Sequence, residues 1–349
     1  MNQLSVLHSI PRVGKIIVLA ILALLLVLLV PRSAFAAVPF KPGYGKGDAA
    51  ECSQTISSGS IENAADALPN GQVLCVRGGV YTEGDKRLNL DISGTSSAPK
   101  KIKAYPGERV ELRGAIKGTG SHWIIEGLFV DASYSRVALG AGERTKTDHA
   151  INWTTATNIR IDSVELINRR PNLDPDLAST CVYIGGTTKP TNITIENSSI
   201  HQCGQLPRVN HEHCVYLAKT SGVTLRNNWI YDCADRSIQL SPDTDNALVV
   251  GNLVDSDSQT GILLDKSADN NTVRNNVVDT PNGKTIYSIR TYSGSNNAVI
   301  DNCVWDTDVR LASDITISGN ILADPQISGH TVTNSSCAAK LPADSPFRP

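Results

Sequence analysis

The stretch Thr224-Leu225-Arg226-Asn227-Asn228-Trp229-Ile230 decides the fold, because apolar residues flank a polar pair rich in asparagine. The same pattern occurs at residues 194–200, 249–254, 273–278, 300–304 and 317–322. When Ser198, Asn228, Asn252, Asn276, Asn302 and Asn320 are aligned, most successive copies follow one another at a spacing of roughly two dozen positions. A repeat this short, made of strand-forming runs broken by turn residues, is typical of one coil of a β-solenoid.

The repeated asparagines are expected to occupy tight corners of the coil. Asparagine tolerates left-handed backbone there, and its amide can bond to the next coil. We assign them a structural role and no chemistry.

Each coil carries a second strand, and these strands align between residues 149 and 291. Because successive side chains of a strand point to opposite faces, alternate positions should point inward and outward. The inward positions are Ile151, Val182, Val215, Ile238, Ile262 and Ile289. The outward positions are Asn152, Tyr183, Tyr216, Gln239, Leu263 and Arg290. We therefore expect an aliphatic core and an outward column with a spacing of about 4.8 Å.

The beginning of the chain has the features of a targeting segment. Basic residues precede an uninterrupted apolar run, Ile16–Val30, and the sequence Ala34-Phe35-Ala36 resembles a cleavage site. We expect residues 1–36 to be a signal peptide and residues 37–349 to form one secreted domain. An uncleaved signal anchor is the alternative, although the apolar run is short for a membrane span.

The charge of the chain argues against a nucleic-acid partner. The 349 residues have a net charge of −2, and the predicted signal peptide contains three basic and no acidic residues, so cleavage would change it to −5. A mildly acidic chain is a poor candidate for nucleic-acid binding. We expect a monomer that has no membrane attachment after cleavage.

All eight cysteines follow the predicted signal peptide, and an even number in an exported chain favours disulfide bonds. No Cys-x-x-Cys motif or Cys/His metal spacing is present. The repeat gives Cys203 and Cys233 equivalent positions on neighbouring coils, and it does the same for Cys181 and Cys214. The predicted bonds are Cys203–Cys233, Cys181–Cys214, and, at the ends of the domain, Cys52–Cys75 and Cys303–Cys337.

Both ends of the mature chain depart from the repeat. Residues 60–68 have helical apolar spacing and are followed by Pro69-Asn70-Gly71. A short helix here would cover the open end of the solenoid core. The tail after Leu322 loses the pattern, and we expect it to cap the other end.

The helix leading into residues 69–81, the stretch 102–107 and the asparagine-bearing coils resemble the right-handed parallel β-helix superfamily, the pectate-lyase-like architecture. The resemblance covers nearly all of the mature chain. It implies an all-β fold, a single right-handed parallel β-helix with a short N-terminal capping helix.

The catalytic signatures of familiar relatives are missing. The chain lacks the Gly-His-Gly and paired-Asp signatures of polygalacturonases, and the Asp-His and Arg-x-Pro-x-x-Arg signatures of common pectate lyases. Its local pattern is similar to secreted β-helix proteins grouped with alginate lyases, chondroitinase B and mannuronan epimerases. The resemblance therefore implies a polysaccharide partner without transferring any catalytic residue.

Three long connections, residues 131–148, 168–179 and 201–212, leave the same corner of successive coils. We expect them to wall one side of the outward column, and such elaborations often carry function. A groove across parallel strands suits an extended polysaccharide.

Cleavage of a uronic-acid polymer by β-elimination needs a cation for the carboxylate, a base and an acid. Arg236 could be the cation, His213 or Lys219 the base, and Tyr216 the acid. The candidate substrate-binding residues are Asn152, Tyr183, His211, Gln239, Lys266 and Arg290. The competing interpretation is that the histidines bond to the backbone and Tyr216 is a stacked rung.

Several aspartates lie near the ends of the outward strands, and the sequence does not determine whether they bind a cofactor. Asp235, Asp257 and Asp265 lie closest to the expected groove and are candidate ligands for Ca²⁺, while paired acids could hydrolyse a glycoside. Aspartate is also an ordinary turn residue. The leading prediction is a secreted polysaccharide lyase. The alternatives are a non-catalytic carbohydrate-binding or structural cell-surface protein, or a glycoside hydrolase.

Overall fold

The computed structural model describes residues 40–135, 137–138, 146–147, 149–169, 180–204, 212–255, 260–279, 287–305, 309–310 and 315–349. The predicted signal peptide lies outside the described residues, as does much of the three long connections. In the part of the chain that the structure describes, no helix is both long and apolar enough to cross a membrane.

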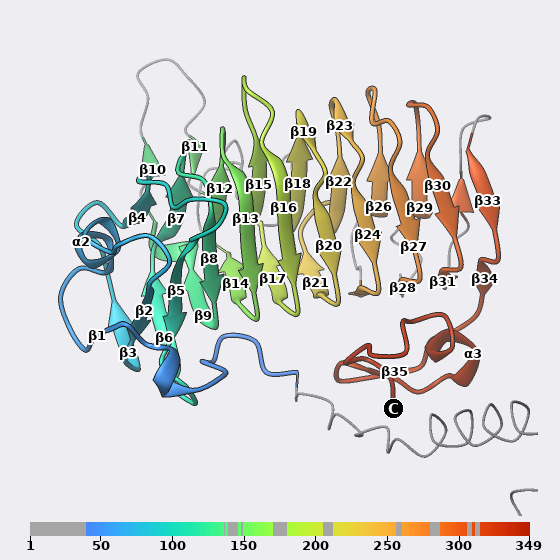
Figure 1. Cartoon of the computed structure of the whole chain (residues 1–349). Coiled ribbons are helices and arrows are strands. Elements are labelled where there is room, and N and C mark those ends of the chain that lie inside the picture. The colour runs from blue at the N-terminus through green and yellow to red at the C-terminus, as the bar shows by residue number, and fades with distance from the viewer. Residues whose placement is uncertain are drawn as a thin grey trace, which may run out of the picture. The chain divides into compact units, whose positions relative to one another are not determined.

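The chain passes through three sheets in turn, and strands of neighbouring coils pair in parallel (Figure 1). Sheet I contains β4 (Arg87–Leu90), β7 (Ala115–Gly118), β12 (Ile151–Trp153), β15 (Val182–Gly185), β18 (Val215–Ala218), β22 (Ile238–Leu240), β26 (Thr260–Leu264), β29 (Tyr287–Thr291) and β32 (Val309–Arg310). Sheet II contains β1 (Gln54–Ile56), β2 (Val73–Val76), β5 (Lys100–Ala104), β8 (Trp123–Glu126), β13 (Thr157–Asp162), β16 (Thr191–Glu196), β19 (Thr220–Ser221), β20 (Thr224–Arg226), β23 (Thr244–Asp245), β24 (Leu248–Val250), β27 (Thr272–Arg274), β30 (Ala298–Ile300) and β33 (Thr316–Ser318). Sheet III contains β3 (Gly79–Tyr81), β6 (Val110–Arg113), β9 (Leu128–Asp131), β14 (Glu165–Asn168), β17 (Ser199–Cys203), β21 (Trp229–Cys233), β25 (Leu253–Asp255), β28 (Val277–Asp279), β31 (Cys303–Val304) and β34 (Ile321–Leu322).

Short elements lie outside these sheets. They are η2 (Ala49–Glu51), α2 (Ile61–Asp66), η3 (Ala132–Tyr134), the antiparallel pair β10 (Val137–Ala138) and β11 (Lys146–Thr147), the antiparallel pair β35 (Ile327–Ser328) and β36 (Thr331–Val332), and α3 (Ser335–Ala338). Helix α2 begins after Ser60, whose hydroxyl accepts a hydrogen bond from the Asn63 amide at 3.1 Å. Its residues Ile61 and Ala65 are buried in the main apolar core.

The strand register confirms the predicted columns of sheet I. Val215 pairs with Val182 on one side and with Ile238 on the other, and the whole inward set is buried. Tyr216 pairs in the same way with Tyr183 and Gln239. Side chains that are a full coil apart in the sequence therefore become immediate neighbours.

Two tryptophans depart from the aliphatic core that the sequence predicts. Trp123 and Trp153 are fully buried. Trp153 lies opposite Gly118 in the register, where a Cβ atom would come within 2.6 Å of the indole ring. The indole N–H of Trp153 donates to the Gly120 carbonyl at 3.0 Å. The large ring fits because its neighbour has no side chain.

At each corner, two adjacent residues divide the two roles predicted for one asparagine, and the prediction of left-handed backbone at the repeated asparagine itself is wrong. The first has positive φ: 53° at Asn227, 67° at Gly251 and 54° at Asn275. The second points inward and bonds to the next coil. The backbone N–H and Nδ2 of Asn252 donate to Oδ1 of Asn276 at 3.0 and 2.9 Å.

This asparagine ladder continues along the coils from Asn228 to Asn320. The Nδ2 group of Asn276 donates to the Val249 carbonyl at 2.9 Å and to Oδ1 of Asn302 at 3.0 Å. Asn276 is fully buried. Each buried amide is thus satisfied only because its neighbours keep the same register.

Two of the four predicted disulfides are confirmed, Cys52–Cys75 and Cys303–Cys337. The predicted bonds Cys181–Cys214 and Cys203–Cys233 are wrong, because the structure joins Cys181 to Cys203 and Cys214 to Cys233. Cys203 and Cys233 are directly paired in the register, as expected. Paired side chains of a parallel ladder point the same way about 5 Å apart, whereas the Cβ atoms of a disulfide lie about 3.8 Å apart. Each bond instead closes one coil where sheet III returns to sheet I.

The tail after Leu322 lies along the side of the coils and does not cover their open end. Val332 and Phe347 of the tail belong to one buried apolar cluster with Leu253 and Val277 of sheet III. At the end of the stack, Ile317 is 57% exposed and Leu322 is 65% exposed. The tail therefore packs against the side of the coils and does not form the expected cap.

Residues 40–52, which we name the N-terminal strap, cross the outer faces of the first coils. The Gly43 N–H donates to the Ser163 carbonyl at 2.8 Å, and the Gly45 N–H donates to the Glu108 carbonyl at 2.9 Å. The disulfide of Cys52 joins the end of the strap to β2.

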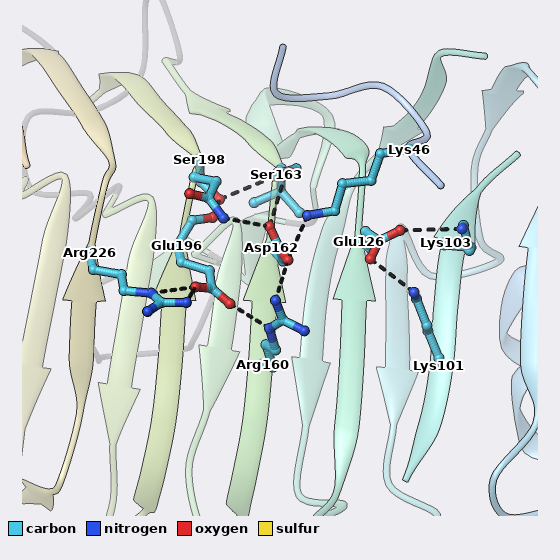
Figure 2. Close-up of polar contacts among 12 residues, drawn as sticks. Lys46, Lys101, Lys103, Glu126, Arg160, Asp162, Ser163, Glu196, Ser198 and Arg226 are labelled. Atoms are coloured by element: carbon cyan, nitrogen blue, oxygen red, sulfur yellow. Dashed lines mark hydrogen bonds and ion pairs between the residues drawn. The ribbon is translucent and has the colours of Figure 1, made fainter. Parts of the chain in front are cut away.

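The strap neutralises charges on the outer face of sheet II (Figure 2). One register column there carries Lys103, Glu126, Asp162, Glu196 and Arg226. Nζ of Lys46 lies 2.7 Å from the buried carboxylate of Asp162. The carboxylate of Glu51 lies 2.9 Å from Nζ of the fully buried Lys103.

These contacts lower the pKa of several carboxyl groups. The hydrogen bond from Lys103 lowers the pKa of Glu51 from 4.5 to about 2. Burial would raise the pKa of Asp162, but hydrogen bonds from Lys46 and Asn197 outweigh it, so that the pKa is lowered. A carboxyl group with a depressed pKa stabilises the folded state most when it is ionised.

Replacing Asn276 by alanine should lower the free energy of unfolding by at least about 3 kcal/mol, because it leaves buried donors and acceptors on both neighbouring coils unsatisfied. Denaturant-induced unfolding measures this loss. The matched control Thr272→Ala changes a half-buried outward residue of the same coil and should cost less than about 1 kcal/mol. Equal costs for the two variants would contradict the ladder.

Glu51→Gln should destabilise the protein at neutral pH and make it less sensitive to acid. The contribution of Glu51 is fully present above its unfolded pKa of 4.5 and is lost as the pH falls toward about 2. The difference in unfolding free energy between wild type and variant should therefore shrink over this range. A difference that does not change with pH would show that the contact with Lys103 is not ionic.

Candidate functional site

Three predicted site residues meet where the strands of sheet I begin. His213 lies just before β18, and Asp235 and Arg236 lie just before β22. Nδ1 of His213 lies 3.3 Å from Oδ2 of Asp235, and Nη1 of Arg236 lies 3.2 Å from the same oxygen. The side chains of His213 and Asp235 are only 1% and 2% exposed, and that of Arg236 is 15% exposed. A buried carboxylate is thus shared between an imidazole and a guanidinium group.

Tyr216 extends this cluster onto the outward face. Its ring meets that of His213 edge-to-face, with centroids 5.2 Å apart, and meets that of Tyr183 at 5.6 Å. Burial raises the pKa of both tyrosines above the ordinary value of 10. Both hydroxyls therefore keep their protons at neutral pH.

The arrangement can hold and move protons. Because Asp235 faces Nδ1, it can orient the imidazole and stabilise its protonated form, with Nε2 as the second proton-carrying atom. Tyr216 can act as a proton donor. Arg236 also donates from Nη1 to Oε1 of Gln239 at 3.1 Å, which connects the cluster to the next residue of the outward column.

Other predicted residues lie where strands of sheet I end, opposite the His213 cluster. Lys219 follows β18, and Asp265 and Lys266 follow β26. Both lysines are exposed. The whole of β18 separates Lys219 from His213, which corresponds to about 20 Å of extended chain. Of the two predicted bases, only His213 lies with Arg236.

The remaining outward residues occupy neighbouring rungs. Asn152 pairs with Tyr183. Arg290 is three rungs beyond Tyr216, about 14 Å away, and its guanidinium lies over the rings of Tyr287 and Tyr292 at 4.7 and 3.8 Å. The structure therefore spreads the predicted binding residues along a face and does not gather them at one point.

Asp235 and Asp265, the two predicted metal ligands that the structure describes, have different neighbours. Asp235 faces His213 and Arg236, while Asp265 accepts a 3.5 Å hydrogen bond from Ser293. Asp257 and the binding candidate His211 lie outside the described residues. Within the described part, no group of three or more His, Cys, Asp or Glu side chains could hold a metal ion.

His149 belongs to this face, although the sequence analysis did not select it. Its ring stacks on Tyr183 with centroids 4.9 Å apart. His149 lies before β12 at the same offset that His213 has from β18. The strand alignment in the sequence could have identified His149, because it places His149 and His213 at equivalent positions before their strands.

Comparison with known proteins shows the fold. Residues 145–305 match the family model described as "Right handed beta helix region". The crystal structure of pectate lyase Pel9A aligns with 85% of this chain and 87% of its own at 12% identity, with a TM-score of 0.56. A GH136 lacto-N-biosidase from Eubacterium ramulus aligns with 78% of this chain and 55% of its own at 14% identity, with a TM-score of 0.50. No curated protein sequence matches the chain.

Identities this low establish a shared fold and leave the activity to be argued from the site. The parallel coils, the asparagine ladder and the match over the central coils agree with each other. The described chain is a right-handed parallel β-helix, as its resemblance to that superfamily predicted.

Proposed function

We propose that this protein is a secreted lyase that cleaves a uronic-acid-containing polysaccharide by β-elimination on the outer face of sheet I. The observation that carries the proposal is the Asp235 carboxylate between His213 and Arg236, with Tyr216 against the imidazole. One solved protein of this fold is named a pectate lyase, which supports an anionic polysaccharide as the substrate class.

Each group has one role in the reaction. Arg236 pairs with the sugar carboxylate and increases the acidity of the neighbouring carbon-bound proton at C5. Nε2 of His213 takes that proton, and the resulting imidazolium is stabilised by Asp235. The electrons of the C5–H bond form the C4–C5 double bond as the C4–O bond breaks. The leaving oxygen receives the proton of Tyr216, whose raised pKa keeps it protonated until then.

One observation favours a second function, a non-catalytic carbohydrate-binding protein. His213 and Asp235 are almost fully buried, as expected for a structural ion pair. The more accessible residues Asn152, Tyr183 and Tyr216 offer hydrogen bonds and a ring for stacking, which is sufficient to bind a sugar chain. Activity measurements distinguish these functions because binding alone produces no new sugar ends.

The lyase should generate unsaturated sugar ends from at least one polymer in a panel of pectate, alginate and unsulfated glycosaminoglycans. Their ultraviolet absorbance measures the rate. His213→Ala and Arg236→Ala should abolish the rate, and Tyr216→Phe should lower it by about 100-fold or more because it removes the acid.

The matched control is His201→Ala. His201 also lies near a carboxylate, with Nε2 3.4 Å from Oε1 of Glu165, and stacks on Tyr231, but it belongs to sheet III. This variant should keep the wild-type rate. Wild-type rates in His213→Ala and Arg236→Ala would reject the site. Binding to a polymer without any new ends would establish the second function instead.

A further inference from the structure

A pocket of about 580 Å³ lies on the outer face of sheet II, away from the cluster around His213. Strands β13, β16, β20, β24 and β27 form its floor, and Pro342 and Asp344 of the C-terminal tail line its rim. The Lys340 carbonyl accepts a 2.7 Å hydrogen bond from Nδ2 of Asn275, which fixes this part of the tail.

The register arranges the floor in two rows that run across the strands. One row places Thr194, Thr224 and Leu248 on successive rungs. The other row places Arg226 and Arg274 two rungs apart, with Val250 between them. Two rungs correspond to about 10 Å, which is similar to the length of a disaccharide.

The arginines of the pocket differ in their ion-pair partners. Arg160 and Arg226 both form ion pairs with the buried carboxylate of Glu196, which lies between them (Figure 2). Their own side chains remain 47% and 52% exposed. Glu196 thus fixes two partly exposed guanidinium groups in the lining of the pocket.

Arg274 is exposed and has no carboxylate partner among the described residues. Its Nη1 donates to Oδ1 of the neighbouring Asn275 at 3.3 Å. A guanidinium group presents a planar fork of donors that matches a carboxylate. Arg274 is therefore the residue of the pocket best suited to bind an incoming anion.

We propose that this pocket is a second carbohydrate-binding site, which takes an acidic oligosaccharide lying across the strands. A sugar carboxylate pairs with Arg274, the hydroxyls of Thr194 and Thr224 bond to sugar hydroxyls, and sugar rings lie against Leu248, Val250 and Pro342. The apolar surface and hydroxyls favour a sugar over a bare polyanion. The site requires no chemistry at sheet I and does not depend on which proposed function is correct.

The negative charge of Asp344 repels such an anionic ligand. It lines the pocket on the tail side and is exposed. Removal of this charge should strengthen the binding of an anion, whereas removal of the Arg274 charge should weaken it. Opposite effects at two residues from such distant parts of the chain would locate the ligand between them.

The test uses the mature protein and a hexuronate hexasaccharide at low ionic strength, with affinity measured by calorimetry. Arg274→Gln should weaken binding by about tenfold, since it removes the charged guanidinium group that pairs with the sugar carboxylate. Arg274→Lys should reduce the affinity less, because lysine keeps the positive charge. Asp344→Asn should strengthen binding by about threefold. The matched control Lys86→Gln removes an exposed cation near β4 and should leave the affinity within about twofold of wild type.

Hydrogen exchange locates the ligand independently of its affinity. Amides of β24 and β27 should be protected by the hexasaccharide in wild type and less so in Arg274→Gln. The proposal would be overturned if a neutral hexasaccharide bound as tightly as the hexuronate, or if Arg274→Gln left the affinity unchanged. Inorganic polyphosphate that binds through Arg274 when the hexuronate does not would assign the pocket to another ligand. Loss of lyase activity in His213→Ala with intact binding at β24 and β27 would leave this proposal standing.

Discussion

The buried asparagine ladder between sheets II and III sets the register on which the rest of the structure depends. In Asn252, Asn276 and Asn302, Oδ1 accepts two hydrogen bonds from the preceding coil, while the amide group donates to a carbonyl of that coil and to the next asparagine. A shift by one residue would leave all of these groups unsatisfied inside the core. Burying an unsatisfied polar group costs about 1 to 3 kcal/mol each, so the ladder strongly disfavours any other pairing.

Because the register is fixed, residues a full coil apart form continuous columns on the outer faces of sheets I and II. On sheet I, it places Tyr183 beside Tyr216 and brings Asp235 of the next coil to His213. On sheet II, it stacks acids and bases from consecutive coils, and additional segments then determine which charges remain accessible. The N-terminal strap neutralises Asp162 through Lys46, whereas no such segment pairs with Arg274 in the described part of the chain.

The sequence predicts features that follow from the repeat period alone. The inward stack around Val215, the outward column around Tyr216 and the asparagine ladder are all properties of equivalent positions, and the structure confirms them. Helix α2 likewise forms within residues 60–68, where the apolar spacing predicts a helix. Equivalence does not determine which of two neighbours a side chain contacts. Cys203 and Cys233 are stacked as predicted, yet each bonds across its own coil, because the direction of the Cβ atoms at a corner is not encoded in the period.

The sequence also cannot show which irregular segment returns to cover which face. The tail containing Val332 has no repeat, so its position beside sheet III, and with it the rim of the Arg274 pocket, appears only in the folded chain. The burial of His213 could not be predicted for the same reason, since periodicity places a residue on a face without showing what packs above it.

A crystal structure of the mature protein tests the central claim most directly, through the distance from the backbone nitrogen of Asn252 to Oδ1 of Asn276. The account predicts about 3.0 Å for this distance and for its equivalents in the neighbouring coils. A structure in which these asparagines face solvent, or in which Asn252 and Asn276 lie more than one strand apart, would contradict it.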